Sequence, residues 1–499
     1  MSVRNVAWSI GERVFLTVLT LVSSPIVVSS FGEARYGMLS LGLTTVGFLA
    51  FADLGITTAA VRELAHAFGK GDKALARRVM ATTLTAYLVL ATVMGGGLML
   101  GADWLARSVF HLPPDQLDEG LFVLRMAGVG LALNLLLAPW TAAARALQRF
   151  DLLTQVSMAM TVYATVGLVV CAKLGSVRAA VLVQLSSTVI SMLVFANVTR
   201  RLAPELLTLP GFDKALFRDL FVFAFYQFLN QILGAMSMHA DKLIIAAWLT
   251  TAEVTYYQIA VGLSQKIHVI TAAAANFVLP RVAELTARGD RPGVLRLFEQ
   301  GARLTMLLAM AVGVPLVIAG PMFLAAWMGP DFAARASSTL QLTAVAYMAF
   351  CTTVMPVLTL LGLGHSRQVT IYLSGIGLAN VGLALVLVPR IGRDGAAWSM
   401  VVAMAWGIAT MLGVQRQLGG SWLQLGRSFA RLVPALAASA AVTWLAVQVL
   451  PGGMPSALLA LAAGGATAIL GYLAVPLWAG ADAAILTDGV RNLRQRLGV

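Results

Sequence analysis

The amino-acid sequence predicts an all-α protein that crosses a lipid membrane about fourteen times. Only 11% of the 499 residues are charged and 59% are hydrophobic, whereas about 25% of the residues in a soluble domain are charged. The apolar residues occur in runs of about 20, which is the length a helix needs to cross about 30 Å of hydrocarbon. The strands of a membrane barrel would alternate apolar and polar residues, and runs such as Leu84 to Leu98 do not.

Fourteen apolar segments follow one another along the chain, and turn residues separate them. The expected spans are 5–30, 36–61, 79–101, 121–144, 153–172, 179–199, 219–248, 252–280, 304–328, 336–363, 368–389, 395–415, 432–450 and 456–478. Pro113-Pro114, Pro210-Gly211 and Pro451-Gly452 are among the turn signals between them. None of the connecting loops is long enough to form a soluble domain.

The basic residues of the loops predict the orientation of the chain in the membrane. If the N-terminus is cytoplasmic, the cytoplasmic segments hold 24 Lys and Arg residues and the opposite loops hold seven. Cytoplasmic loops of membrane proteins carry an excess of Lys and Arg, so both termini are expected in the cytoplasm. The net charge of +13 is therefore explained by membrane orientation, and no nucleic-acid partner is expected.

A weak internal repeat divides the chain. A shift of 221 residues places Tyr36 on Tyr257 and Glu63 on Glu284, with three further identities between residues 36 and 64. Six spans separate the copies, so both halves have the same orientation, and an axis along the membrane normal would relate them. The expected domains are a six-helix N-terminal lobe (1–200), a six-helix C-terminal lobe (201–416), and two last helices with a basic cytoplasmic tail (417–499).

Several segments of this repeat resemble a known family. Phe31-Gly32-Glu33-Ala34-Arg35-Tyr36-Gly37, followed by Phe51-Ala52-Asp53-Leu54-Gly55-Ile56, is similar to the start of polysaccharide transporters of the Wzx type. Asp241-Lys242-Leu243-Ile244-Ile245 and Val278-Leu279-Pro280 resemble the seventh and eighth spans of the same group. The chain is therefore identified as a member of the polysaccharide branch of the multidrug/oligosaccharidyl-lipid/polysaccharide exporter superfamily.

The resemblance implies a flippase in the bacterial inner membrane. It would move undecaprenyl-pyrophosphate-linked oligosaccharides for O-antigen, capsule or exopolysaccharide synthesis, with two lobes around a cavity that opens to one side at a time. Lipid-linked oligosaccharide and membrane lipids are the implied partners, with a polysaccharide polymerase and a chain-length regulator as further ones.

Other functions with a similar architecture stay open. Lipid II flippases and cation-coupled multidrug antiporters belong to the same superfamily. A membrane-embedded polysaccharide polymerase or ligase is the enzyme alternative, but it needs a large outer loop with catalytic groups. The longest outer loop here, 102–120, is short.

Ionisable side chains within spans are candidates for a functional site, because a charge in hydrocarbon is costly. The candidates for binding an anionic head group are the cations Lys266, Lys242, Arg125 and Arg13. Lys266 is the leading candidate, since it lies near the middle of its span with no carboxylate one helical turn away. For Lys242 and Arg125 the alternative is snorkelling to the interface, and Lys242 could also pair with Asp241.

Three carboxylates are candidates for coupling transport to protons or sodium, namely Asp53, Glu12 and Asp241. Arg13 and Asp53 fall at a similar depth on adjacent spans. A structural ion pair between them is the alternative interpretation, and the sequence alone leaves both open.

Amide side chains on spans 7 and 8 are candidates for hydrogen bonding to sugars. At about 100° per residue they fall on one face of each span, and a polar face is costly to expose to lipid. They are Gln227, Asn230 and Gln231 on span 7, and Gln258, Gln265 and Asn276 on span 8. Ordinary hydrogen bonding between helices is the alternative.

Signatures of enzymes, cofactors and metals are missing from the sequence. Gly69-Lys70-Gly71 does not fit the spacing of a phosphate-binding loop. The five histidines are scattered, and both cysteines, Cys171 and Cys351, fall in apolar spans. No catalytic residue, cofactor or bound metal is therefore expected.

Overall fold

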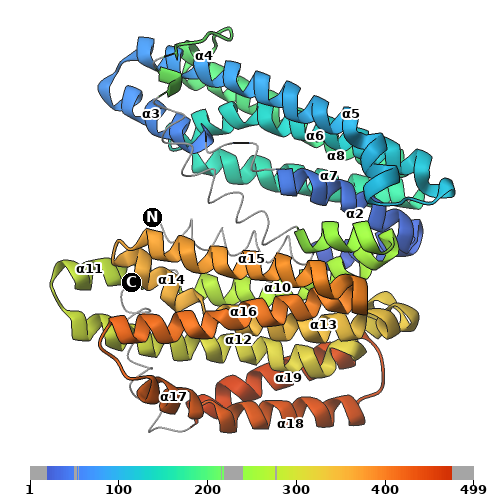
Figure 1. Ribbon diagram of the computed structural model, residues 1–499, viewed down its shortest axis with the longest axis vertical. Helices are drawn as coiled ribbons and strands as arrows, with labels where there is room; N and C mark the ends of the chain where they lie inside the picture. The colour runs from blue at the N-terminus through green and yellow to red at the C-terminus, as the bar shows by residue number, and fades with distance from the viewer. Residues whose placement is uncertain are drawn as a thin grey trace. The chain divides into compact units, whose positions relative to one another are not determined.

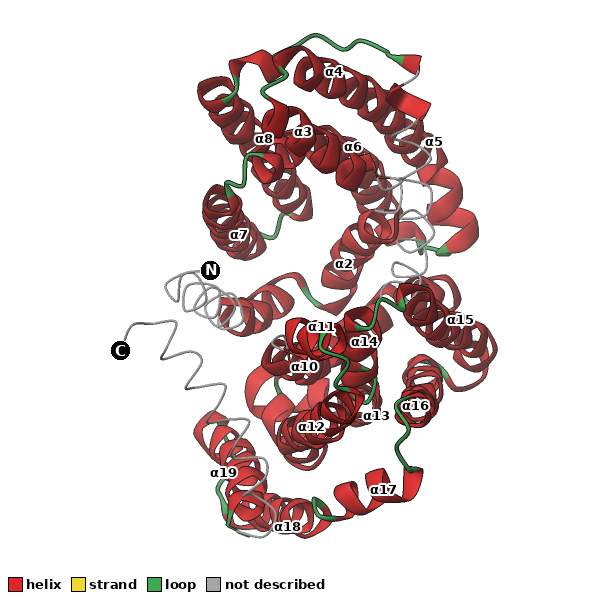
Figure 2. Cartoon of the chain, turned by 90° about the vertical axis from the view of Figure 1, so that its left-hand side faces the viewer, coloured by secondary structure: helices red, strands yellow, loops and turns green. Residues whose placement is uncertain are grey.

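The computed structural model describes residues 19–49, 53, 56–214, 216–218, 240–275 and 278–474. Over these ranges the chain forms helices joined by short turns, and no strand occurs in them (Figure 1, Figure 2). The chain divides into two compact units, which we call the N-unit (Val6–Thr255) and the C-unit (Tyr256–Val499). The division falls within α10 (Thr251–Ala275).

The helices follow one another with short connections in both units. The N-unit contains a helical segment Leu19–Phe31, α2 (Glu33–Phe48), α3 (Ile56–Lys70), α4 (Lys73–Leu90), η2 (Ala91–Gly95), α5 (Gly96–Trp104), η3 (Leu105–Val109), α6 (Pro114–Ala146), α7 (Phe150–Lys173), α8 (Val177–Leu202), η4 (Pro204–Leu206) and a helical stretch 240–248. After α10, the C-unit contains α11 (Val278–Ala287), α12 (Arg291–Met328), α13 (Pro330–Cys351), α14 (Val354–Gly362), α15 (Ser366–Ile391), α16 (Arg393–Gln417), α17 (Trp422–Ala430), α18 (Val433–Val449) and α19 (Met454–Leu473).

Ten helical runs within the described residues are long and apolar enough to cross a membrane. The first is Lys73–Val109 and the last is Met454–Leu473, and the ten fall at predicted spans 3 to 6 and 9 to 14. Leu19–Phe31, α2 and α10 lie within predicted spans 1, 2 and 8, whereas most of predicted span 7 is outside the described residues. The prediction of an all-α protein with many membrane-spanning helices is confirmed.

Predicted span 2 (36–61) is divided in the structure. Its first part, α2, ends at Phe48, and α3 begins at Ile56. The buried residues of α3 recur at intervals of one, three or four, which leaves its opposite face polar. α3 is therefore an amphipathic helix rather than the apolar end of a span.

Predicted span 10 (336–363) also breaks, between α13 and α14. The break falls at Thr352 and Thr353, whose hydroxyls donate to the carbonyl oxygens of the preceding turn. Pro356 explains the position of the break, because a proline has no N–H to bond the carbonyl oxygen four residues earlier.

The same order of elements occurs near the start of each half of the chain. α2, α3 and α4 correspond to α10, α11 and α12, and α3 and α11 are both short and amphipathic. In the turn that follows, Gly71 and Gly289 have positive φ angles of 68° and 71°. The next residue, Asp72 or Asp290, caps the following helix by accepting a backbone N–H at 2.8 Å. The two glycines are 218 residues apart, whereas the repeat aligns the preceding helices with a shift of 221. The turn therefore comes three residues earlier after α11 than after α3.

The two glutamates that the repeat aligns both form ion pairs. Arg62 donates to Glu63 at 2.6 Å, while Arg281 and Arg288 donate to Glu284 at 2.7 and 2.6 Å. The hydrogen bond from Arg281 lowers the pKa of the Glu284 carboxyl. Exposed pairs of this kind contribute little to stability, so they chiefly set the local charge of α3 and α11.

α6 is the central helix of the N-unit and packs against α2, α3, α4, α5 and α8. It approaches η2 closely. A Cβ atom at Gly95 would lie 2.8 Å from the carbonyl oxygen of Gly128, and one at Gly128 would lie 2.7 Å from that of Gly95. Small residues let the backbones of membrane helices approach in this way, and the contacts replace a hydrophobic driving force between helices in lipid.

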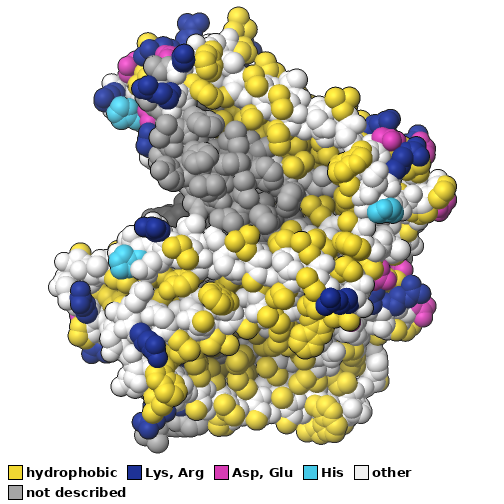
Figure 3. Space-filling view, viewed as in Figure 1, with side chains coloured by type: hydrophobic (Ala, Val, Ile, Leu, Met, Phe, Trp, Pro, Cys, Tyr) yellow, Lys and Arg dark blue, Asp and Glu magenta, His cyan; other side chains and the backbone are white. Residues whose placement is uncertain are grey.

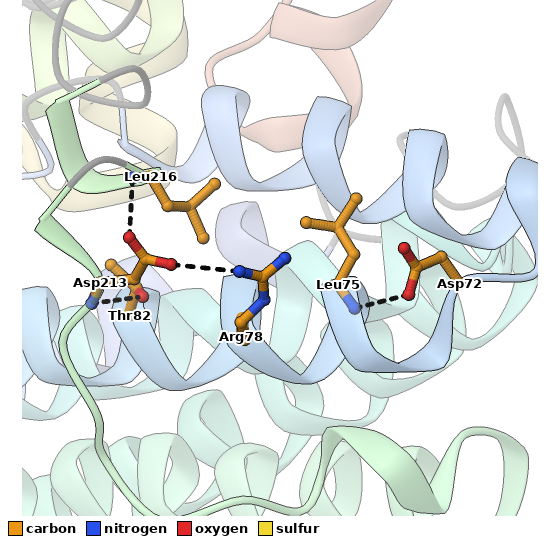
Figure 4. A network of polar contacts seen from close by, with 6 residues as sticks. All are labelled: Asp72, Leu75, Arg78, Thr82, Asp213 and Leu216. Carbon is orange, nitrogen blue, oxygen red and sulfur yellow. Dashed lines mark hydrogen bonds and ion pairs between the residues drawn. The ribbon is translucent and has the colours of Figure 1, made fainter.

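The segment that follows η4 folds back onto α4 through Asp213 (Figure 4). The backbone N–H of Asp213 donates to the hydroxyl of Thr82 at 3.3 Å. Its carboxylate accepts the backbone N–H of Leu216 at 3.1 Å and pairs with Arg78 at 3.5 Å. These contacts hold Asp213 against α4.

α12 is the central helix of the C-unit and packs against α13, α18 and α19. The hydroxyl of Ser439 on α18 donates to the carbonyl oxygen of Gly464 on α19 at 2.7 Å. A Cβ atom at Gly464 would lie 2.0 Å from Oγ1 of Thr443 and 2.8 Å from Cγ of Pro315 on α12. The last two helices of the C-unit, α18 and α19, therefore pack tightly against each other and against α12.

Charged side chains gather near the ends of the helices, and hydrophobic side chains cover the surface between them (Figure 3). In the N-unit, one hydrophobic cluster, which includes Leu64 and Leu206, joins the end of α3, the start of α4, and the ends of α6 and α8. These helix ends carry Lys70, Arg78 and Arg145. These three basic residues, which belong to the segments expected on the cytoplasmic side, thus lie at one end of the N-unit.

We expect Gly464→Ala to destabilise the docking of α18 and α19. The added methyl group has no room between Thr443 and Pro315, and overpacking typically costs about 1–3 kcal/mol. The apparent melting temperature of the protein purified in detergent should therefore fall. Gly101→Ala is the matched control, because a Cβ atom at Gly101 meets nothing within 4 Å. Equal melting temperatures for the two variants would contradict the tight docking.

Candidate functional site

α10 packs against α13 through one face. The hydroxyls of Ser264 and Thr343 are 2.8 Å apart, and the rings of His268 and Phe350 have centroids 4.6 Å apart. Thr271 lies on the same face and is fully buried. His268 is thus a partly buried histidine that packs against an aromatic ring, and its Nδ1 has no hydrogen-bond partner among the described residues.

Among the described residues, little covers the opposite face of α10, which we call its open face. At about 100° per residue, Gly262, Lys266 and Val269 lie about half a turn around the helix from Ser264. A Cβ atom at Gly262 would meet nothing within 4 Å, and Val269 is 36% exposed. Lys266 is partly buried on this face and forms no ion pair or hydrogen bond with any residue that the structure describes.

An ammonium group without a counter-ion is costly in a membrane helix. The cost at the centre of a bilayer is about 2.5–3.5 kcal/mol on insertion scales, and such residues face water or a partner charge. The structure offers Lys266 no carboxylate within the described ranges. Lys266 is therefore available to an anionic ligand, and a phosphate group would supply the missing charge.

Two amides lie beside the open face of α10. Gln258 and Gln265 fall between the packed face and Lys266, and both are partly buried. Oε1 of Gln258 is buried and has no hydrogen-bond partner among the described residues. An acceptor of this kind would bond a hydroxyl group or water, so this edge of α10 is suited to a polar ligand.

Asp53 of the N-unit belongs to a hydroxyl network. Its carboxylate accepts a hydrogen bond from Thr57 at 2.5 Å and another from Tyr87, and the hydroxyls of Thr57 and Tyr87 are 2.6 Å apart. Tyr87 is fully buried. A carboxylate held among hydroxyl groups could take up a proton or contribute oxygen ligands to a cation. The other half of the expected pair, Arg13, lies outside the described residues.

Asp241 and Lys242 are both buried, with 4% and 8% of their surfaces exposed. The Asp241 carboxylate accepts the backbone N–H of Lys242 at 2.9 Å. The Lys242 ammonium forms no ion pair with a described residue. Arg125 is exposed on α6 and likewise has no ion pair within the described ranges.

The remaining sequence-predicted residues lie outside the described part of the chain. They are Glu12, Arg13, Gln227, Asn230, Gln231 and Asn276.

A cavity of about 610 Å³ lies within the N-unit between α6, α7 and α8. Eleven of its eighteen lining residues have polar side chains. Asn134, Thr141 and Arg145 come from α6, Ser157 is one of four hydroxyl residues from α7, and Gln184 is one of four polar residues from α8.

This cavity was not predicted from the sequence. Its signal was present on predicted span 5, where Thr154, Ser157, Thr161 and Thr165 recur at intervals of three and four. Predicted span 6 continues it with Gln184, Ser187, Thr188 and Ser191. Serine and threonine are common in membrane helices, where they bond to their own backbone, so the spacing by itself does not indicate a cavity.

Comparison with known proteins places the chain in a family. A family model described as polysaccharide biosynthesis protein matches residues 31–336, which is more than half of the chain. The chain belongs to this family. A relative from Shigella flexneri, named "Putative O-antigen transporter", is 21% identical over 412 residues, which cover 81% of this chain and 95% of the relative.

Solved structures share the fold. The lipid II flippase MurJ in an inward closed conformation has a TM-score of 0.76 at 10% identity, covering 94% of this chain and 99% of MurJ. An inward-facing multidrug resistance transporter of the MATE family, in the MOP superfamily, has a TM-score of 0.68 at 16% identity and covers 82% and 96%. The predicted fold is confirmed. The relative and these two neighbours are named as transporters or as a flippase, in line with the expectation that the chain is not an enzyme.

We expect Asp53→Ala and Tyr87→Phe to be coupled. Each substitution removes the same hydrogen bond, and a bond to a charged group contributes about 1.5–3 kcal/mol. In a double-mutant cycle the loss of stability of the double variant should be smaller than the sum of the single losses. Thermal unfolding of the purified protein provides the measurement. Strictly additive losses would show that the network does not act as a unit.

Proposed function

We propose that the chain is a flippase for undecaprenyl-pyrophosphate-linked oligosaccharides in the synthesis of a surface polysaccharide. The family match and the relative named as an O-antigen transporter support a role in polysaccharide export. The observation that carries the choice of an anionic, lipid-linked substrate is the unpaired Lys266 on the open face of α10.

The chemistry of the head group fits this face. A diphosphate carries negative charge that must be compensated when it leaves water, and a charge-assisted hydrogen bond is about twice as strong as a neutral one. Lys266 would supply the cation. Gln258 and Gln265 would accept and donate hydrogen bonds to the first sugar or to water.

Alternating access is the mechanism we propose. The head group would bind to a cytoplasm-facing state, the two lobes (1–200 and 201–416) would change their arrangement, and the head group would leave on the opposite side while its lipid tail stays in the bilayer. A substrate shifts such an equilibrium only if it binds the two states differently. Asp53, with Glu12 and Asp241, would couple this change to a proton or sodium gradient, and Lys242, Arg125 and Arg13 would extend the cationic path.

The proposed location is the bacterial inner membrane with both termini in the cytoplasm. The loop charges support this orientation, because 24 basic residues would face the cytoplasm and seven the other side. In this location the chain would work beside a polysaccharide polymerase and a chain-length regulator.

Deletion of the gene in its host tests the function. We expect undecaprenyl-linked repeat units to accumulate on the cytoplasmic side and surface polysaccharide to be lost, and the wild-type gene should restore it. An unchanged glycan profile would contradict the proposal and favour lipid II or drug transport. Unpolymerised units on the outer side would favour a polymerase or ligase.

Complementation of the same strain tests Lys266. We expect Lys266→Ala to reduce surface polysaccharide about tenfold or more, since a lost charge-assisted contact costs about 1.5–3 kcal/mol. Lys266→Arg keeps the charge and should retain more activity. Lys73→Ala is the control, because Lys73 is exposed at the start of α4. Normal polysaccharide with well-expressed Lys266→Ala would refute the assignment.

A further inference from the structure

The cavity between α6, α7 and α8 has more hydrogen-bonding groups than its own packing uses. Some lining residues, such as Thr161 and Ser191, donate to a carbonyl oxygen of the preceding turn, as is usual for such residues in helices. The side chains of five others make no hydrogen bond with any described residue. They are Thr154, Ser157, Thr165, Gln184 and Thr188.

These unpartnered groups indicate a cavity that is filled with water or a polar ligand. Each polar group left unsatisfied in hydrocarbon costs several kcal/mol, so an apolar environment at the lining of α7 and α8 would be unfavourable. The volume of about 610 Å³ lies within the range of about 300–1,000 Å³ that is typical of ligand sites.

The cavity is elongated, and its charge is confined to one end. Its lining on α7 extends from Leu153 to Leu168, which corresponds to about 22 Å of helix. Arg145, near the end of α6, is exposed at the same end as Leu153 and forms no ion pair with a described residue. The described residues of the lining include no Asp or Glu. A matching ligand would be an extended polyol with a negative charge at one end.

We propose that this cavity is a binding site for a sugar phosphate. The hydroxyls of α7 and the amide and hydroxyls of α8 bond to the saccharide, and Arg145 pairs with the phosphate. None of the lining residues that the structure describes comes from α10. The proposal rests on the proposed function only in taking the saccharide to be part of a lipid-linked oligosaccharide.

Cysteine protection tests the site in the full-length protein in detergent. Ser157→Cys should react with a water-soluble maleimide, because its environment is wet, and the natural Cys171 and Cys351 are buried. N-acetylglucosamine 1-phosphate is the probe. At a concentration about tenfold above its dissociation constant it should slow the labelling of this cysteine about tenfold, since binding reduces the open fraction by a factor of 1 + [L]/Kd.

The controls separate the two parts of the ligand. N-acetylglucosamine without phosphate should protect more weakly, and Arg145→Gln should reduce protection by the sugar phosphate to that level. Val166→Cys lies on the opposite face of α7 and is 52% exposed, so the probe should not change its labelling. No protection at Ser157→Cys up to the solubility limit of the probe, or equal protection by inorganic phosphate alone, would overturn the proposal.

A second pair of variants distinguishes this proposal from the proposed function. Ser157→Leu and Thr188→Leu fill the cavity, and in the deletion strain they should reduce surface polysaccharide, whereas Val166→Leu should not. If the filled variants export normally while the deletion strain does not, the cavity proposal fails and the flippase stands. If the deletion leaves the glycans unchanged, the flippase fails, and cysteine protection still decides whether the cavity binds sugar phosphates.

Discussion

The hydrocarbon core of a bilayer offers no hydrogen-bond partner, so each polar group of a membrane helix must bond within the protein, to water or to a ligand. Groups that bond within the protein are structural, and the others are open to a ligand. Most buried hydroxyls bond to their own helix or to a neighbour, as Ser439 does with Gly464. Asp53 is held by Thr57 and Tyr87. Polar side chains without a partner among the described residues include Lys266 and Gln258 on α10 and five that line the cavity between α6, α7 and α8.

α10 has a special place in the fold because the division between the two units falls within it. Its first turn is fixed to α2 in the N-unit. Thr255 donates to the carbonyl oxygen of Glu33 at 2.7 Å, and a Cβ atom at Gly37 would lie only 1.7 Å from the carbonyl oxygen of Thr251. The remainder packs against α13 in the C-unit. A transport cycle that moves the units would therefore act directly on the helix that carries Lys266.

The fold was largely predictable from the sequence, because apolar runs of the right length have few alternatives to membrane helices. The breaks in the helices could not be predicted. A proline such as Pro356 can also occur within an unbroken membrane helix, and the residues of α3 follow an apolar run in the sequence without a turn signal. For the site, the sequence singled out Lys266 because no nearby residue offers a counter-charge, and the structure adds none within the described ranges. The cavity was missed because it forms from three helices, and no single helix reveals which of its hydroxyls lack a partner.

Translocation in a reconstituted system tests the central claim most directly, which is that an anionic lipid-linked head group crosses the membrane along this chain through Lys266. Proteoliposomes would be prepared with undecaprenyl-pyrophosphate-linked oligosaccharide from the deletion strain, and an impermeant oxidant of sugars would report the glycan exposed outside. The account predicts that the wild-type protein makes the inner pool accessible and that Lys266→Ala leaves it protected. Equal exposure with both proteins, or none with the wild type, would contradict it.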